Sequence, residues 1–168
     1  VSEKKDNVDT DYITINNTTI TLSSGIPAGV YRYIVKATDT NSGSEKNATY
    51  IITITKQKSN VVTNMSVTPE GVVTFTNSSN ADGYLISIDG INYTPVVPGE
   101  GTTSVNYLNE ITGNSGNRTI YVKATNSDGD NYETSDPVTA TVTVYKLTTA
   151  SNNTNDGTVS ASLNFISG

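Results

Sequence analysis

The stretch Tyr33-Ile34-Val35-Lys36-Ala37-Thr38-Asp39 returns 87 residues further on as Ile120-Tyr121-Val122-Lys123-Ala124-Thr125-Asn126. In each copy, small or apolar side chains occupy every second position and a lysine lies on the opposite side. This period of two is typical of a half-buried β-strand. The two copies therefore predict the same strand in two places along the chain.

Each copy leads through a polar loop into a second alternating run. These runs are residues 48–54 and 138–144, and their matched ends, Ile54 and Val144, lie 90 residues apart. A repeat of 87 to 90 residues made of short strands has the size of one immunoglobulin-type sandwich. We therefore predict an all-β chain of two tandem antiparallel β-sandwich domains.

Composition narrows the function classes. The chain has 168 residues and a formal net charge of −6, without a cluster of basic residues. Such a chain repels nucleic-acid phosphates and anionic lipid surfaces, so we expect neither as a partner. No apolar run approaches the roughly 18 residues that a membrane span needs. Because the chain begins at Val1, we expect a mature or excised piece of a protein.

The chain contains neither cysteine nor histidine. Disulfides, thiolate nucleophiles, histidine bases and metal sites with nitrogen or sulfur ligands are thus excluded. Only carboxylates, Lys, Tyr, Ser and Thr remain for catalysis, and no pair of carboxylates stands out from the scattered acidic residues. We predict that the protein is not an enzyme.

The first domain is predicted over residues 1–58 and is incomplete. Residues 1–10 are charged and polar, which predicts a linker or a frayed end. Residues 12–15 and 19–22 alternate on either side of Asn16-Asn17, a pair that tolerates a tight turn, and this predicts a β-hairpin. The alternation lapses over residues 56–60, where we place the domain boundary.

The second domain is predicted over residues 59–147 and has more strands. Seven alternating runs are expected at residues 61–68, 72–76, 84–88, 93–97, 103–108, 119–125 and 138–145. Alternation assigns the core to Val73, Phe75, Tyr84, Ile86, Ile88, Val105, Tyr107, Ile120, Val122, Ala124, Val138, Ala140, Val142 and Val144.

Two stretches resemble known families. Residues 26–39 are similar to the glycine, tyrosine and V-x-A-T-D run near the end of bacterial cadherin-like and immunoglobulin-like repeats. Residues 122–129 with 135–138 resemble the last two strands of fibronectin type III-like domains. The resemblance implies prokaryotic surface adhesins, stalks and spacers, with no catalytic residues to transfer. The chain departs from antibody-type domains because it lacks Cys and Trp.

Residues 148–168 are predicted to be a linker followed by an extra strand. Residues 158–165 alternate, and Gly157-Thr158-Val159 falls where Gly71-Val72-Val73 stood one repeat earlier. This strand either opens a third repeat in a longer array or is a donor that completes the first domain of a neighbouring copy. Its candidate donor side chains are Val159, Ala161, Leu163 and Phe165.

Eight positions match the N-x-[ST] pattern for N-glycosylation. They are Asn16, Asn17, Asn47, Asn64, Asn77, Asn92, Asn117 and Asn152. A chain this rich in Asn, Ser and Thr contains several such matches by chance, but all except Asn64 fall at predicted turns, strand ends or linkers. Glycans there would coat the surface.

One loop gathers acidic residues. Asp128, Asp130 and Asp136 are oxygen ligands that could hold Ca²⁺, although a seven-coordinate calcium loop needs a fuller ligand set. The competing interpretation is a solvated acidic loop. No other cofactor is expected.

These observations predict an extracellular structural protein of a prokaryotic cell surface. It would be a segment or subunit of a pilus-like filament or an adhesin stalk, and its partners would be other copies of itself, joined head to tail by strand donation. The alternative is a carbohydrate- or host-binding module, either an adhesin or the accessory domain of a secreted hydrolase, for which the ten tyrosines could supply a sugar platform.

Overall fold

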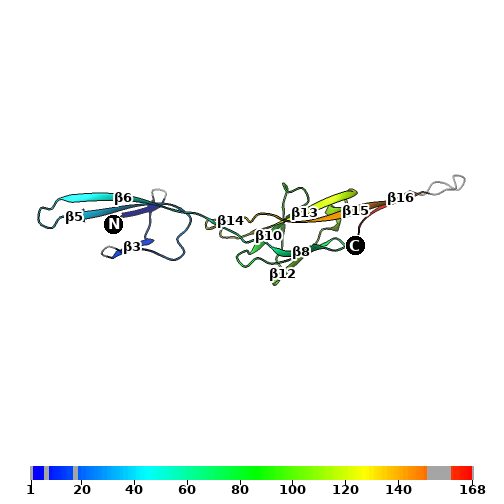
Figure 1. Cartoon of the computed structure of the whole chain (residues 1–168), viewed down its shortest axis with the longest axis horizontal. Helices are drawn as coiled ribbons and strands as arrows, with labels where there is room; N and C mark the ends of the chain where they lie inside the picture. The colour runs from blue at the N-terminus through cyan, green and yellow to red at the C-terminus, as the bar shows by residue number, and fades with distance from the viewer. Residues whose placement is uncertain (1, 6–7, 17–18, 151–159, 168) are drawn as a thin grey trace. The chain divides into compact units, whose positions relative to one another are not determined.

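The computed structural model describes residues 2–5, 8–16, 19–150 and 160–167. The chain divides into two compact units. Unit 1 consists of Val1–Gln57 with Asp128–Asn131, and unit 2 consists of Lys58–Ser127 with Tyr132–Gly168. In the described part, the regular structure is β apart from one short helix, so the all-β prediction is confirmed (Figure 1).

Unit 1 contains one four-stranded antiparallel sheet, ordered β2-β1-β5-β6, and one separate hairpin, β3-β4. The strands are β1 (Ser2–Lys5), β2 (Val8–Asp9), β3 (Ile13–Asn16), β4 (Thr19–Leu22), β5 (Gly29–Thr38) and β6 (Glu45–Ile54). The hairpin predicted around Asn16 is confirmed, with Ile13 opposite Leu22 and Asn16 opposite Thr19.

The prediction that residues 1–10 form a linker or a frayed end is wrong. Strand β1 pairs with β5, from Ser2 opposite Ile34 to Lys5 opposite Tyr31. Strand β1 is held in the ladder by backbone hydrogen bonds, which form whatever the side chains are. This pairing therefore leaves no mark on the hydrophobic pattern of the segment itself.

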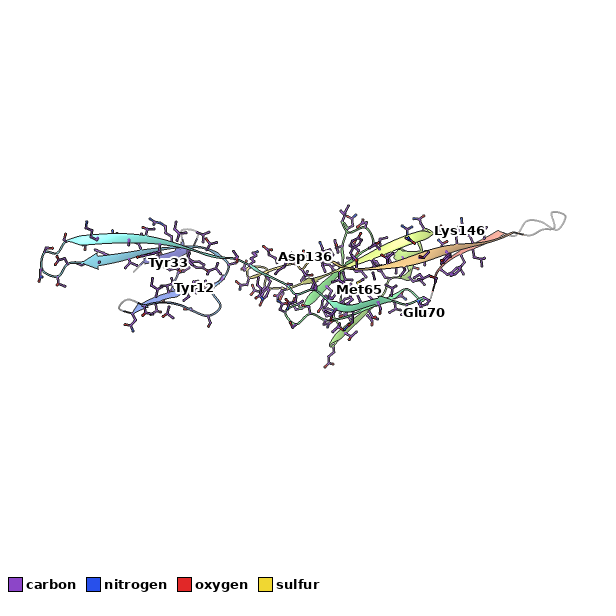
Figure 2. The ribbon with its side chains drawn as sticks, viewed as in Figure 1. Tyr12, Tyr33, Met65, Glu70, Asp136 and Lys146 are labelled. Atoms are coloured by element: carbon purple, nitrogen blue, oxygen red, sulfur yellow. The ribbon has the colours of Figure 1, made fainter. Side chains whose placement is uncertain are left out.

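Tyrosines dominate the small core of unit 1. Tyr31 and Tyr33 of β5 are buried together with Ile13 of the hairpin. Tyr12 meets the Tyr31 ring edge-on, at 5.8 Å between centroids and 88° between planes, and Tyr12 and Tyr33 lie between the hairpin and the sheet (Figure 2). The Tyr31 hydroxyl donates to the Pro27 carbonyl at 2.7 Å, so this buried polar group is satisfied.

Unit 2 contains a five-stranded sheet ordered β11-β10-β13-β15-β16 and a three-stranded sheet ordered β12-β9-β8. The five-stranded sheet consists of β10 (Gly83–Ser87), β11 (Thr94–Val96), β13 (Gly116–Thr125), β15 (Val138–Ala150) and β16 (Ser160–Ile166). The other comprises β8 (Thr63–Val67), β9 (Val72–Thr76) and β12 (Thr102–Asn106). The short strands β7 (Gln57–Lys58) and β14 (Tyr132–Glu133) and the helix α1 (Leu108–Thr112) complete the described elements.

Both sheets of unit 2 contribute to one hydrophobic core. Val73 and Phe75 come from β9, whereas Ile120 and Val122 come from β13. The rings of Phe75 and Tyr84 meet edge-on at 5.0 Å. The predicted core residues that are buried are Val73, Phe75, Tyr84, Ile86, Tyr107, Ile120, Val122, Ala124 and Val144, while Val105, Val138, Ala140 and Val142 are half-buried.

Five core positions depart from the prediction. Val62 and Val96 are buried, although alternation did not assign them to the core. Ile88 is exposed, because β10 ends at Ser87 and the following residues form a turn. Ile111 is fully buried on helix α1, in a segment for which no helix was predicted. Ile166, at the end of β16, is also buried.

The internal repeat is preserved down to the pairing register. Strands β5 and β13 are each ten residues long and begin 87 residues apart, at Gly29 and Gly116. Gly29 lies opposite Ile54, and Gly116 lies opposite Val144. The duplicated stretches therefore build the same antiparallel ladder twice.

Candidate functional site: two uncovered apolar sheet surfaces

The extra strand β16 belongs to the sheet of unit 2. It pairs antiparallel with β15, from Val144 opposite Ile166 to Ala150 opposite Ser160. The strand predicted to end at Tyr145 thus continues through Ala150, and this extension provides the partner for β16. Neither occupant considered from the sequence, a third repeat or a neighbouring copy, is needed to pair the inner edge of β16.

The side chains of the β15–β16 hairpin alternate in the opposite phase to that expected. Ile166 is only 4% exposed and joins the core. The Asn164 side-chain amide donates to the Thr112 carbonyl at 2.7 Å, which ties the hairpin to the end of helix α1. The side expected to need cover, with Leu163 and Phe165, faces away from the core.

That outward side forms an apolar surface, which we call the hairpin patch. It consists of Tyr145, Leu147, Leu163 and Phe165, each between 44% and 64% exposed. Tyr145 lies directly opposite Phe165, and Leu147 lies opposite Leu163. The Tyr145 and Phe165 rings stack at 5.8 Å with 27° between their planes. Of the other donor candidates, Val159 and the side chain of Ala161 lie outside what the structure describes.

Strand β16 is also the last strand of its sheet. Natural edge strands are usually protected by charges, proline or a bulge. The sequence of β16, SASLNFI, has no charged residue and no proline, and its pairing with β15 proceeds without a register shift. The strand therefore lacks the features that discourage pairing with another chain.

Unit 1 carries a second uncovered surface, which we call the open face. It lies on the side of the β5–β6 ladder that also bears Tyr33 and that ends at Lys46, opposite Ala37, and its apolar members are Val35, Ala37, Ala48 and Tyr50. Val35 is half-buried and the other three are exposed. The β3–β4 hairpin covers only the other half of this side, where Tyr31 and Tyr33 are buried.

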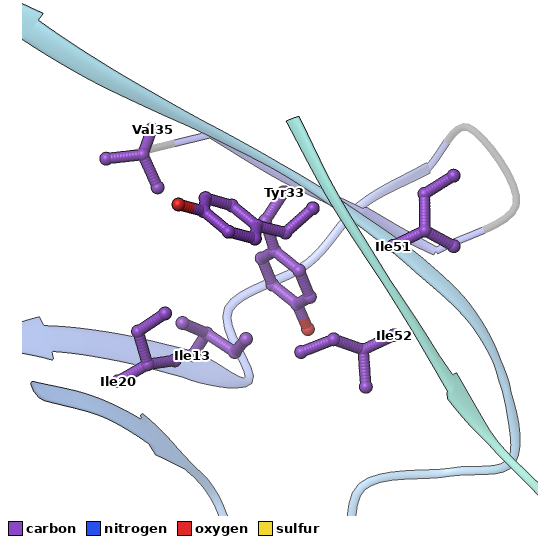
Figure 3. Close-up of a pocket in the computed structure, with 7 residues that line it drawn as sticks. Ile13, Ile20, Tyr33, Val35, Ile51 and Ile52 are labelled. Carbon is purple, nitrogen blue, oxygen red and sulfur yellow. The ribbon is translucent and has the colours of Figure 1, made fainter. Parts of the chain in front are cut away.

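A pocket of about 100 Å³ lies where the hairpin cover stops. Its lining is almost entirely apolar and consists of Ile13, Ile20, Tyr33, Val35, Tyr50, Ile51 and Ile52. Figure 3 shows Ile13 and Ile20 of the hairpin facing the side of Tyr33, with Val35 and Ile52 contributed by β5 and β6. Ile20 remains 47% exposed at the rim.

The repeat shows what is missing above the open face. Val35 and Ala37 correspond to Val122 and Ala124 of unit 2, which are completely buried. Those two residues belong to the core that unit 2 builds with strands of its second sheet. Among its described strands, unit 1 has only the β3–β4 hairpin outside its four-stranded sheet.

Two of the three candidate calcium ligands, Asp128 and Asp136, are engaged in other interactions. The Asp128 carboxylate accepts from the Asn131 backbone and side chain, at 3.2 and 2.8 Å. Asp136 pairs with Lys58 at 2.6 Å and belongs to unit 2, whereas Asp128 and Asp130 belong to unit 1. No group of three or more acidic residues that could hold a metal ion occurs among the described residues.

The glycosylation candidates differ in whether their side-chain nitrogen is hydrogen-bonded and in how exposed they are. The side-chain nitrogens that would carry a glycan donate hydrogen bonds at Asn64 (to Thr76, 3.2 Å), Asn77 (to Gly99, 2.7 Å) and Asn92 (to Asp89, 2.7 Å). Asn77 is also half-buried. Asn16, Asn47 and Asn117 are exposed. Asn17 and Asn152 lie outside the described residues.

A tight turn in unit 2 holds an unusual carboxylate. The Asp89 carboxylate accepts from the backbone nitrogens of Asn92 and Ile91, each at 2.8 Å, from the Asn92 amide, and from the Ser87 hydroxyl. These hydrogen bonds hold the pKa of Asp89 well below its ordinary value, with the Asn92 backbone contributing most. All of its partners lie within three residues, so the group stabilises a turn.

No protein-family model matches the chain, and no curated protein matches its sequence. Among the described residues, no helix has the length and apolar character required to cross a membrane.

Proposed function

We propose that this protein is a non-enzymatic structural segment of a prokaryotic cell-surface fibre, pilus-like filament or adhesin stalk, built from two tandem immunoglobulin-like or fibronectin type III-like modules. The observation that carries this proposal is that the same antiparallel ladder occurs in both units with the same pairing register. Stalks of this kind are commonly built from repeated β-modules. The resemblance of residues 26–39 and 122–129 to bacterial surface repeats supports the same assignment.

The polar chemistry of the chain supports a non-catalytic role. Asp82, Asp89 and Asp128 each bind groups of nearby turns or loops. The absence of cysteine and histidine removes the commonest nucleophile and base. The lack of cysteine also suits a surface protein that has to hold its fold without disulfides, through sheet packing alone.

In this role, resistance to tension comes from the ladders. The β5–β6 pairing extends over ten residue pairs, from Gly29 opposite Ile54 to Thr38 opposite Glu45. Pulling along paired antiparallel strands loads their interstrand hydrogen bonds together, so that the ladder yields in one step. Each unit should therefore behave as a separate mechanical element.

Single-molecule force spectroscopy on the tethered chain tests this function. We expect two discrete unfolding events, one for each unit, and no saturable binding on a glycan array or to cell surfaces. A chain that extends without a force peak would overturn the mechanical role.

The alternative is a carbohydrate- or host-binding module, and the pocket beside Tyr33 and Tyr50 is the feature that favours it. Sugar recognition combines an aromatic face with hydrogen-bonding groups that fix the hydroxyls. The other lining residues of this pocket are aliphatic, so we place it second. Specific glycan binding that Tyr50→Ala abolishes would establish the alternative.

A further inference from the structure

In the described part of the chain, the hairpin patch and the open face are apolar surfaces that a single copy leaves uncovered. The hairpin patch places four large side chains on one side of the β15–β16 ladder, and the open face leaves half of the β5–β6 ladder without a cover. Contiguous exposed apolar patches on a soluble protein mark interaction sites, because leaving them in water costs free energy. We therefore expect both surfaces to be covered by a partner.

The repeat indicates the kind of partner that fits the open face. In unit 2, the residues equivalent to Val35 and Ala37 are buried under strands whose inward side chains alternate, such as Val73 and Phe75 of β9. The cover that unit 1 lacks is thus an antiparallel ladder with apolar side chains on one side. The hairpin patch is a surface of this kind, with the cross-strand pairs Tyr145–Phe165 and Leu147–Leu163.

We propose that the hairpin patch of one copy packs on the open face of unit 1 in a second copy, so that the chains associate head to tail. This proposal rests on the proposed function, since it identifies how the segments of the fibre would be joined. The hairpin would act as the missing layer of the neighbour's sandwich, with the two ladders face to face at about 10 Å.

The geometry of such a contact leads to an open assembly. The donor surface lies in unit 2 and the acceptor surface lies in unit 1, so the contact is heterologous. After each docking event, one hairpin patch and one open face remain free, and a further copy can add at either end. A twofold dimer through two hairpin patches would cover only one of the two surfaces, and it would leave the open face in water.

Cross-linking between two single-cysteine variants tests the contact directly, because the natural chain contains no cysteine. Phe165→Cys and Tyr50→Cys place one thiol on each surface, and a short bismaleimide spans facing sheets about 10 Å apart. We expect the mixture to give a cross-linked heterodimer, and neither variant alone to cross-link comparably. Val97→Cys, at a side chain 86% exposed elsewhere in unit 2, is the matched control and should not cross-link to Tyr50→Cys.

Sedimentation velocity over a range of protein concentrations gives a second readout. Leu163→Lys introduces a charge into the hairpin patch and should weaken association at least about tenfold, because it removes one large apolar contact. Val97→Lys makes the same chemical change outside the patch and should associate like the natural chain. Far-UV circular dichroism of each variant confirms that the fold is retained, as expected for exposed positions.

Mixing two variants, each with one surface disabled, distinguishes head-to-tail docking from docking between two hairpin patches. Leu163→Lys retains a working open face and Tyr50→Lys retains a working hairpin patch, so head-to-tail docking predicts that the mixture forms dimers and stops there. If Tyr50→Lys alone still associates like the natural chain, the contact is patch to patch and the proposal is wrong. A natural chain that stays monomeric at every concentration also overturns it. Neither result affects the mechanical test of the proposed function, because modules joined within one polypeptide need no contact between copies.

Discussion

At the residue scale, Asp89 shows how one side chain organises a turn. It accepts hydrogen bonds from Ile91, Asn92 and Ser87, and its pKa is lowered because these bonds favour the charged carboxylate. A group whose pKa is lower in the folded than in the unfolded chain stabilises the fold above its unfolded pKa, near 3.9. This stabilisation is lost as the pH falls below that value.

We therefore predict that Asp89→Asn lowers the urea midpoint of unit 2 at pH 7 and reduces its loss of stability below about pH 4. The measurement is urea denaturation at a series of pH values between neutral and strongly acidic. Glu100→Gln removes an exposed carboxylate from another loop of the same unit and is the control. If Asp89→Asn and the natural chain lose stability in parallel on acidification, the turn does not depend on the ionised carboxylate.

Neighbouring residues of β16 have opposite environments, and this leads to a second prediction. Ile166 is buried, so Ile166→Ala should destabilise unit 2 by about 2 kcal/mol, at the low end of the range for core truncations because it lies on an edge strand. Leu163→Ala, on the exposed side, should change stability by no more than about 0.5 kcal/mol. Both values come from urea denaturation at low protein concentration, where association does not contribute. Equal effects would contradict the observed phase of the hairpin.

At the scale of elements, the sequence predicts strands best where both sides of the pattern are distinct. The ladder containing Tyr33 and its repeat at Ile120 follow from alternation alone, because one side is buried and the other is solvated. The β3–β4 hairpin follows from its turn residues. Alternation fails for β1, whose position depends on a partner more than twenty residues away in the chain.

The incorrect predictions for helix α1 and strand β16 have identifiable physical causes. Helix α1 has only five residues, which is too short to show a helical period, so Ile111 gives no periodic signal. In β16, the residues Phe165 and Ile166 are both apolar and point to opposite sides, so the sequence is compatible with either phase. The candidate donor residues were recognisable as an apolar strand side, but the length of β15, which decides where that strand pairs, was not.

At the scale of the whole molecule, the two units differ greatly in their cores. Among the residues that the structure describes, the buried cluster of unit 1 contains three, Ile13, Tyr31 and Tyr33, whereas that of unit 2 contains thirteen. Since apolar burial is the main source of stability, unit 1 should unfold first.

We predict two transitions in differential scanning calorimetry, with the lower one belonging to unit 1. If head-to-tail docking covers the open face, the lower transition should also rise with protein concentration, because binding to the folded form stabilises it by mass action. Tyr50→Lys should remove this concentration dependence. A single cooperative transition would mean that the units do not fold independently.

The uncharged edge of the molecule has a consequence for its behaviour in acid. Strand β16 has nothing to titrate, so its capacity to pair is the same at any acidity, and only the electrostatic repulsion contributed by the rest of the surface changes. With an isoelectric point near 4.4, that repulsion disappears in mildly acidic surroundings. Acidification should therefore strengthen the association between copies of this chain, while neutral or alkaline buffer should weaken it.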